Sequence, residues 1–462
     1  MNHSHTTTGA RAGRGRSFRL RFGLAALTVA AAACNTDTLV NLQNPDVITG
    51  EVARDTANIN ELRNGVQFEF ARALTGPATN NATPGIIGLS GVLSDEMWYA
   101  STFPTMQDVD RRSIDVSNGD LLTAYQYLHR ARNIAERAAE QYVKTTRNNS
   151  ADHAMVTNLA GYSYVLFAEN FCSGVPFSRT EFTGELTFGP QYTTAQMLDS
   201  AIVRFDAAIA RGTAAGSSDQ VNLAKIGKAR ALLDKDSYAA AAAAVAGVPS
   251  DFVYDVQYSE NSSGQSNGVW QNINTEKRSS AASGEGLNGI VFFRRGTRPG
   301  NTTDQRAPVD STGRGLGTTV PEYSTLKYPT KGSPVPLATG VEARLIEAEA
   351  ALNKGASNAY LTTLNQLRSD AGIVAPLIDP VTADGRVRQF FEERAFWLWM
   401  TAHRVGDLRR MVRSYGYTQT AVWPTGQTIN GSSYGTDVNF PVPFQEQNNP
   451  QFANGKCIDR NP

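Results

Sequence analysis

The sequence predicts a mainly α-helical protein whose helices stack in pairs, interrupted by one long loop-rich insertion with short strands. Apolar residues recur at helical spacing through residues 53–249 and again in the helical pairs of 341–462, which also holds an extended tail; we expect these two segments to form one body. Residues 223–248 and 341–373 each combine an alanine-rich helix, a short turn and a second helix. This pattern is typical of tetratricopeptide-like stacking, although the Trp and Pro of that consensus are missing. Two ordinary helical hairpins are the alternative.

The N-terminal segment predicts export. An apolar run from Phe22 to Ala33 follows five arginines and stops at Cys34. A membrane-spanning helix needs about 20 apolar residues, so this run is too short to span but suits a signal peptide. Because a bacterial lipoprotein signal ends at a Cys, we expect a signal peptide at 1–33, lipidation of Cys34 and an extended leader at 34–52. An ordinary secretory signal is the alternative.

Helices are expected in order along the first half. The segment 55–74 places apolar residues on one face at spacings of three and four, and 120–142 repeats the pattern. We expect residues 158–171 to follow as the antiparallel partner of 120–142. The segment 194–212 is a further helix, with Gly212 as its expected C-cap.

The insertion, residues 250–340, is rich in Gly, Ser, Asn, Thr and Pro. It includes an apolar, β-prone run at 289–295, which predicts a strand. A segment of this length is too long for a simple connection, and such loops commonly carry function. We therefore expect it to hold a ligand-binding region. Beyond it, 387–416 reads as one long helix, and the proline-rich tail reads as extended.

Several chemistries find no support in the sequence. The 43 basic and 43 acidic residues balance, and no basic patch of the kind that binds nucleic acid stands out. Beyond the signal, His129, His153 and His403 lie in no metal-ligand spacing. The segment 284–289 matches G-x-G-x-x-G, but a strand follows it and no helix opens there, so we interpret it as a flexible loop. We expect no catalytic residue, metal or cofactor.

Two adjacent acid pairs, Asp95-Glu96 and Glu392-Glu393, raise the possibility of a glycosidase. Such catalysis needs two carboxylates that face one bond across about 5–10 Å. Adjacent residues on one helix point away from each other, so solvated or capping acids are the favoured interpretation.

The late helix also carries charged residues at helical spacing. Arg404 and Asp407 are three apart and can pair on one face. We expect a structural ion-pair network between packed helices that includes Glu393, Arg394, Arg404, Asp407 and Arg409.

Aromatic side chains among polar neighbours are the candidate ligand contacts, because rigid apolar ring faces bind at low entropic cost. Three clusters qualify, and each could instead pin a long loop to the body. The first follows the early helices and also holds Phe103, the second lies in the insertion, and the third lies near the C-terminus. Their candidate residues are Trp98 and Tyr99; Tyr254, Tyr258, Trp270 and Tyr323; and Trp423 and Tyr434.

Four motifs stand out: the late segment "EERAFWLWMTAHRVGDLRR" (residues 392–410), the closing "NFPVPFQEQNNPQF", the step "AENFCSGVPFS" and the lipoprotein signal. Together they resemble the SusD/RagB family of nutrient-binding outer-membrane lipoproteins. The late segment is the strongest match, although Trp397 and Thr401 replace two glutamates of the family pattern. The resemblance covers essentially the whole mature chain.

The resemblance implies a SusD-like helical body, a loop-built site for a nutrient such as a glycan, and no catalysis. It also implies a partner, a SusC-like TonB-dependent outer-membrane barrel, and lipid-anchored localisation at the cell surface. A surface glycoside hydrolase and a lipid-anchored protein-binding scaffold are the alternatives. With Cys34 lipidated, Cys172 and Cys457 remain and could form a disulfide in an oxidising compartment, or stay as two buried thiols.

Overall fold

The computed structural model describes residues 56–286, 289–292, 304–373, 375–452 and 455–461. The expected signal peptide, the lipidation site Cys34 and the leader lie outside these residues. Among the described helices, none combines the length and apolar character that a membrane span requires.

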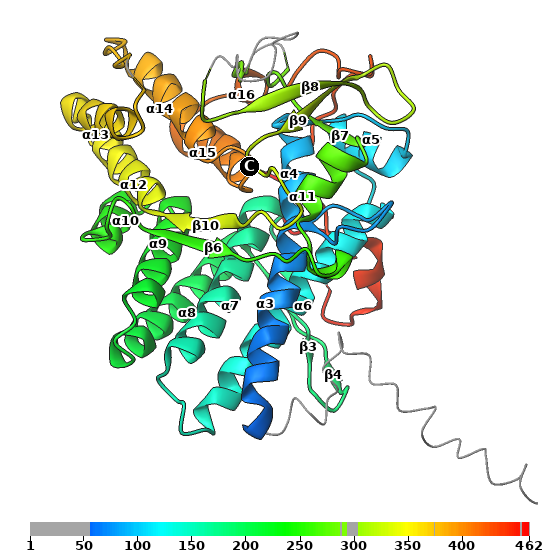
Figure 1. Cartoon of the computed structure of the whole chain (residues 1–462), viewed down its shortest axis with the longest axis vertical. Coiled ribbons are helices and arrows are strands. Elements are labelled where there is room, and N and C mark those ends of the chain that lie inside the picture. Colours follow the sequence, from blue (N-terminus) through cyan, green and yellow to red (C-terminus); the bar gives the residue numbers. More distant parts are fainter. Residues whose placement is uncertain (1–55, 287–288, 293–303, 374, 453–454, 462) are drawn as a thin grey trace, which may run out of the picture. The chain divides into compact units, whose positions relative to one another are not determined.

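The described residues are mainly helical, which confirms the predicted fold class (Figure 1). The α-helices are α3 (Ile59–Thr75), α4 (Ile86–Leu93), α5 (Pro104–Asp110), α6 (Gly119–Val143), α7 (Ala151–Asn170), α8 (Thr194–Ala214), α9 (Ser218–Asp234), α10 (Tyr238–Val245), α11 (Gly268–Trp270), α12 (Gly340–Asn353), α13 (Ser357–Asp370), α14 (Ala383–Trp397), α15 (Arg404–Tyr415) and α16 (Gln419–Val422). Shorter turns of 3₁₀ or π type are η2 (Thr56–Asn58), η3 (Ser263–Gln265), η4 (Gln271–Thr275) and η5 (Phe444–Asn448).

Neighbouring helices along the chain pack on one another, as a helical-repeat body requires. Helix α6 packs on α3 and α7, α8 on α7 and α9, and the series continues through α10, α12 and α13 (Figure 1). The two expected hairpins are α9 with α10 and α12 with α13. On α3, the predicted apolar face is buried, from Ile59 to Leu74.

Small residues set how closely the central helices approach. Helix α7 is buried on nearly all sides. A Cβ added at Gly161 of α7 would lie 2.8 Å from the Phe205 ring of α8, and one added at Gly227 of α9 would lie 2.4 Å from the same ring. Phe205 therefore fills space that only glycine leaves on both neighbouring helices, which is the close approach expected of small residues.

Two local predictions are wrong. Gly212 lies inside α8, which ends at Ala214, and the left-handed residue that follows is Gly216, with φ of 66°. The expected helix 387–416 is divided into α14 and α15. Met400 and Ala402 have φ of 54° and 62° in the break between them, and a helix cannot continue through left-handed residues. Periodicity alone does not reveal this break, because both halves bury apolar residues.

The insertion contains short antiparallel strand pairs as well as loops. The strands of the described chain are β1 (Met97–Tyr99), β2 (Val175–Pro176), β3 (Arg179–Thr180), β4 (Leu186–Thr187), β5 (Gln191–Tyr192), β6 (Val253–Val256), β7 (Ser279–Ala281), β8 (Val309–Arg314), β9 (Pro321–Thr325) and β10 (Val335–Thr339). They pair as β1–β7, β6–β10, β2–β5, β3–β4 and β8–β9. The described part of the strand expected at 289–295 forms a single bridge, from Val291 to Gly284; residues 293–295 lie outside the description.

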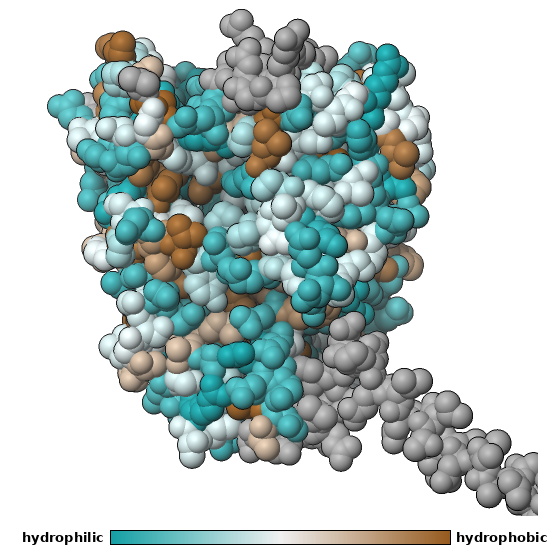
Figure 2. Space-filling view, viewed as in Figure 1, coloured by the Kyte–Doolittle hydropathy of each residue, from teal (hydrophilic) through white to brown (hydrophobic). Residues whose placement is uncertain are grey.

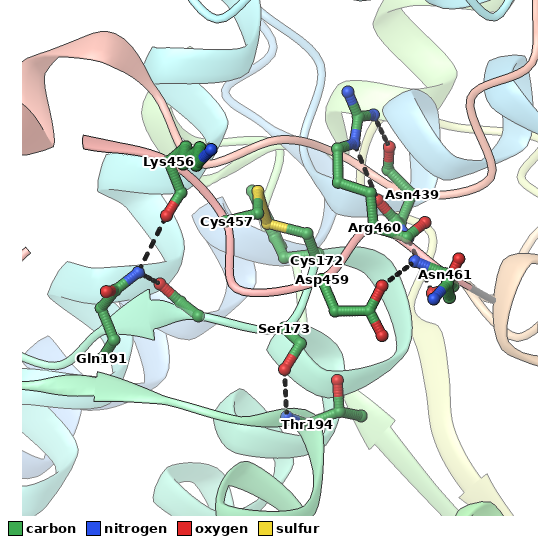
Figure 3. The surroundings of a disulfide bond; sticks show 12 residues. Cys172, Ser173, Gln191, Thr194, Asn439, Lys456, Cys457, Asp459, Arg460 and Asn461 are labelled. Atoms are coloured by element: carbon green, nitrogen blue, oxygen red, sulfur yellow. Dashed lines mark hydrogen bonds between the residues drawn. A yellow bond between two sulfur atoms is a disulfide. The ribbon is translucent and has the colours of Figure 1, made fainter. Parts of the chain in front are cut away.

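The C-terminal tail returns to the end of α7, where the predicted disulfide joins Cys172 and Cys457 across a Cα–Cα distance of 6.1 Å (Figure 3). Ser173 continues the contact, because its backbone N–H donates to the carbonyl of Asp459 at 3.0 Å. The side-chain amide of Gln191 bridges the same region. Of the two alternatives that the sequence left open, a disulfide or two buried thiols, the structure therefore contains the disulfide.

Candidate functional site

The first aromatic cluster divides between core and surface. Trp98 and Tyr99 lie on β1, opposite Ser280 and Ser279 of β7, and are 4% and 1% exposed. Both rings are therefore enclosed by the protein, and direct ligand contact by this pair is not supported. Phe103, four residues further on, is 40% exposed.

The third aromatic cluster is also internal, and so is Tyr323 of the second cluster. Tyr323 on β9 is 3% exposed and Trp423 is fully buried. The Arg112 guanidinium lies 5.0 Å from the centre of the Trp423 ring. Tyr434 is half-buried, and its hydroxyl donates to Asp95 at 2.5 Å. These side chains hold loops against the body, so the structure corrects the expectation that Tyr323 and Trp423 face a ligand.

The adjacent acids Asp95 and Glu96 are 0% and 1% exposed, which corrects the expectation that they are solvated or capping. The Oε1 atom of Glu96 accepts a hydrogen bond from the backbone N–H of Met400 at 3.0 Å, while burial raises the pKa of its carboxyl to about 7. Burial, then the nearby Asp110 carboxylate, raises the pKa of Asp95. Burial likewise raises the pKa of Asp110 to about 7. Their hydrogen bonds give these acids a structural role.

In the second acid pair, Glu392-Glu393, only one residue is buried. Glu392 is exposed, but Glu393 is buried and ion-paired to Arg306 and Arg368, with 2.6 Å between the charged atoms in each pair. The Glu393 carboxylate is thus held by two guanidinium groups, as expected of a member of a structural network.

The expected ion-pair network exists, with different partners. Asp407 pairs with Arg394 at 2.9 Å and with Arg410 at 2.8 Å. Burial opposes its ionisation, but these two guanidinium groups hold the pKa of Asp407 well below its ordinary value. Arg404 does not pair with Asp407 as expected; it binds the distant Glu285 at 2.5 and 2.6 Å.

Arg409 likewise departs from the prediction. Its Nη1 donates to the carbonyls of Ala168, Glu169 and Phe171 at 2.7–3.2 Å, so it satisfies the end of α7 instead of joining an ion pair.

Phe103 is the exposed aromatic residue around which a polar surface gathers. It is the N-cap of α5, and Pro104 occupies the first helical position, so its ring projects where the chain leaves the core. The Arg278 guanidinium lies 4.4 Å from the ring centre, a cation–π distance. Arg278 is itself held by Glu276, at 2.7 Å, and by the side chain of Asn81.

Side-chain amides complete this surface. The amide of Gln271 donates to Asn80 at 3.4 Å, and Trp270, which is part-exposed, precedes Gln271. Leu316, which is 46% exposed, donates its backbone N–H to the carbonyl of Lys277. We call the group of Phe103, Asn80, Asn81, Gln271, Arg278 and Leu316 the Phe103 surface. Sequence reasoning named the Phe103 ring but not its partners.

Two of the insertion aromatics line a pocket. Tyr254 of β6 and Tyr258, which follows this strand, face the second half of α3 across a cavity of about 250 Å³. We call it the α3–β6 pocket. Trp270 does not line it and instead donates its indole N–H to the carbonyl of Pro329 at 3.1 Å. The structure thus brings Tyr254 and Tyr258 together, and separates them from the other candidates.

No protein-family model and no curated protein matches the sequence, but solved structures share its fold. A SusD superfamily protein from Bacteroides vulgatus is 15% identical, with 86% of this chain and 98% of that chain covered and a TM-score of 0.60. A SusD-like carbohydrate-binding protein from Bacteroides fragilis is 16% identical, with 87% and 99% covered and a TM-score of 0.61. Surface glycan-binding protein A from Bacteroides thetaiotaomicron, in complex with laminarihexaose, is 13% identical, with 88% and 99% covered and a TM-score of 0.58.

The chain therefore has the SusD-like fold across most of its length. The resemblance to SusD/RagB proteins that the sequence motifs indicate is confirmed at the level of the fold. Because fold alone does not specify function, the ligand, partner and location of this chain follow as proposals.

Proposed function

We propose that this protein is a lipid-anchored, outer-membrane glycan-binding protein that delivers its ligand to a SusC-like TonB-dependent barrel. The fold supports the proposal, because solved neighbours that cover most of the chain include a carbohydrate-binding protein and a complex with laminarihexaose. The anchor is Cys34, at the end of the expected signal peptide.

The observation that carries glycan binding is the Phe103 surface. A part-exposed ring that is fixed by Arg278 at 4.4 Å provides an apolar face at little entropic cost. The carbon-bound hydrogens of a sugar ring pack on such a face, while its hydroxyls bond to amides such as those of Asn80 and Gln271. The site binds without making or breaking bonds, since Asp95, Glu96 and Glu393 are held in buried structural contacts.

Calorimetry with laminarihexaose and a panel of other soluble oligosaccharides tests this proposal, with Phe103→Ala as the variant. We expect the Kd of the bound glycan to rise at least tenfold, which is about 1.4 kcal/mol. Phe188→Ala is the matched control, because Phe188 is also 40% exposed. Equal effects of both variants, or no binding of any glycan, would refute the proposed site. Release of reducing sugar would instead indicate a hydrolase.

The transport partner is tested by affinity capture from gently solubilised native membranes. We expect a large β-barrel protein to accompany the lipidated chain, and less of it to accompany Cys34→Ala. A folded, lipidated protein that is captured alone would contradict the partnership. Capture of the barrel with no glycan affinity would favour the protein-binding scaffold.

A further inference from the structure

The α3–β6 pocket is separate from the Phe103 surface and shares no residue with it. Its volume is about 250 Å³, just under the range of about 300–1,000 Å³ typical of drug-sized ligands. It therefore has room for one small ring rather than for a chain. Its walls come from the second half of α3, from β6 and the residues after it, from η3 and from Leu159 of α7. Figure 1 shows α3 and β6, and Figure 2 shows the same face of the molecule with polar and apolar residues intermixed.

The interior of the pocket is aromatic. Phe68, Tyr254 and Tyr258 contribute three rings, all of which are part-buried. The hydroxyl of Tyr258 donates to the carbonyl of Ala71 at 3.0 Å, which fixes this ring against α3. Gly264, which also lines the pocket, leaves space beside the Phe68 ring. A Cβ added at Gly264 would lie 3.9 Å from that ring, an ordinary contact distance.

The mouth of the pocket is polar and electrically balanced. Gln67, Gln257 and Gln265 line the pocket and are exposed, so three side-chain amides are available at its rim. Arg72 and Asp255 supply one charge of each sign. Balanced charge favours neither an anion nor a cation, and the amides suit hydroxyl groups.

The frame of the pocket is pre-formed. The Ser266 hydroxyl contacts the carbonyls of Ser259 and Ser262, each at 2.8 Å, and closes the loop around η3. The backbone N–H of Ala78 donates to the carbonyl of Ser263 at 2.9 Å, which ties this loop to the end of α3. Strand β6 is held by its pairing with β10. A rigid site loses little entropy on binding.

We propose that the α3–β6 pocket binds a single neutral sugar ring, and so forms a second glycan subsite beside the Phe103 surface. The ring would stack between aromatic walls, with its hydroxyls on the rim amides. The choice of a sugar among small neutral ligands rests on the proposed function, whereas the pocket and its polarity do not.

Saturation-transfer NMR with methyl α- and β-hexopyranosides of glucose, galactose and mannose, on the full mature chain, tests this proposal. We expect transfer from at least one glycoside and its loss in Gly264→Leu, because the added side chain occupies the cavity. Phe68→Ala, which removes one wall, should weaken the same binding at least tenfold. Gly119→Leu is the matched control, because a Cβ at exposed Gly119 meets nothing within 4 Å. It should bind as the wild type does, and circular dichroism should confirm that each variant is folded.

The outcomes separate this inference from the proposed function. If oligosaccharides bind and Phe103→Ala abolishes that binding, but no methyl glycoside shows transfer, only the pocket inference fails. Transfer that survives Gly264→Leu and disappears in Phe103→Ala would place the sugar ring on the Phe103 surface and overturn the pocket inference. If neither oligosaccharide nor glycoside binds, both proposals fail.

Discussion

Removal of the disulfide between Cys172 and Cys457 should destabilise the protein substantially. The two cysteines are 285 residues apart in the sequence, so the cross-link closes a loop that spans most of the described chain. The loop-entropy relation then gives a ceiling of about 5.6 kcal/mol at 25 °C. Loss of native disulfides usually costs about 2–5 kcal/mol, and we expect a value in this range for the double variant Cys172→Ala/Cys457→Ala.

Urea unfolding followed by circular dichroism, compared between the oxidised wild type and the double variant, measures this effect. An entropic origin also predicts a steeper denaturant dependence, because the unfolded chain without its cross-link is less compact. The wild type in the presence of a reductant is the control, since it retains both side chains. A loss under about 1 kcal/mol with an unchanged slope would refute this reasoning; it would show that the backbone contacts around Ser173 hold the tail without the bond.

Three further predictions concern the core. Arg394→Met should lower the free energy of unfolding, measured by chemical denaturation, by about 3–5 kcal/mol, because it leaves the buried Asp407 carboxylate without one partner. Arg388→Met, which removes an exposed ion pair, should lower it by at most about 1 kcal/mol. The folded pKa of Glu96 is about 7, which lies above its unfolded value. Its contribution to stability should therefore be fully present below about pH 4 and lost as the pH rises through 7. Glu96→Gln should flatten that part of the stability–pH curve, and an unchanged curve would contradict the assignment. Gly227→Ala should lower the melting temperature, because its Cβ would lie 2.4 Å from a buried ring, whereas Gly119→Ala should not; equal melting temperatures for the two variants would disprove the packing argument.

Much of the helical body is predictable because the signals are local. The apolar face of α3 repeats at spacings of three and four, so Ile59 and Leu74 are identified as buried without knowledge of what covers them. Breaks are harder to predict. The turn around Met400 and Ala402 interrupts a segment that is apolar on both sides, and the left-handed backbone there is stabilised by contacts from elsewhere, such as the hydrogen bond from Met400 to Glu96.

The ion-pair partners of charged residues are likewise only partly predictable from the sequence. The sequence identifies Arg404 as a structural cation, and spacing suggests Asp407 as its partner. The structure gives it Glu285, 119 residues away, because the insertion folds back over the late helices. No local pattern contains that information, since the sequence separation of two ionic partners is set by packing between elements.

The sequence by itself determined the helical class and the aromatic residues worth testing, and it predicts an export signal at its start. It left open whether Cys172 and Cys457 bond, which the structure decided. Only the tertiary structure decided which of those aromatics are accessible. Trp98 and Phe103 are five residues apart, yet the first is buried on β1 and the second is exposed at the start of α5. The sequence shows that an aromatic ring is present at a position. Whether that ring is exposed depends on which distant segments cover it, and folding brings those segments there.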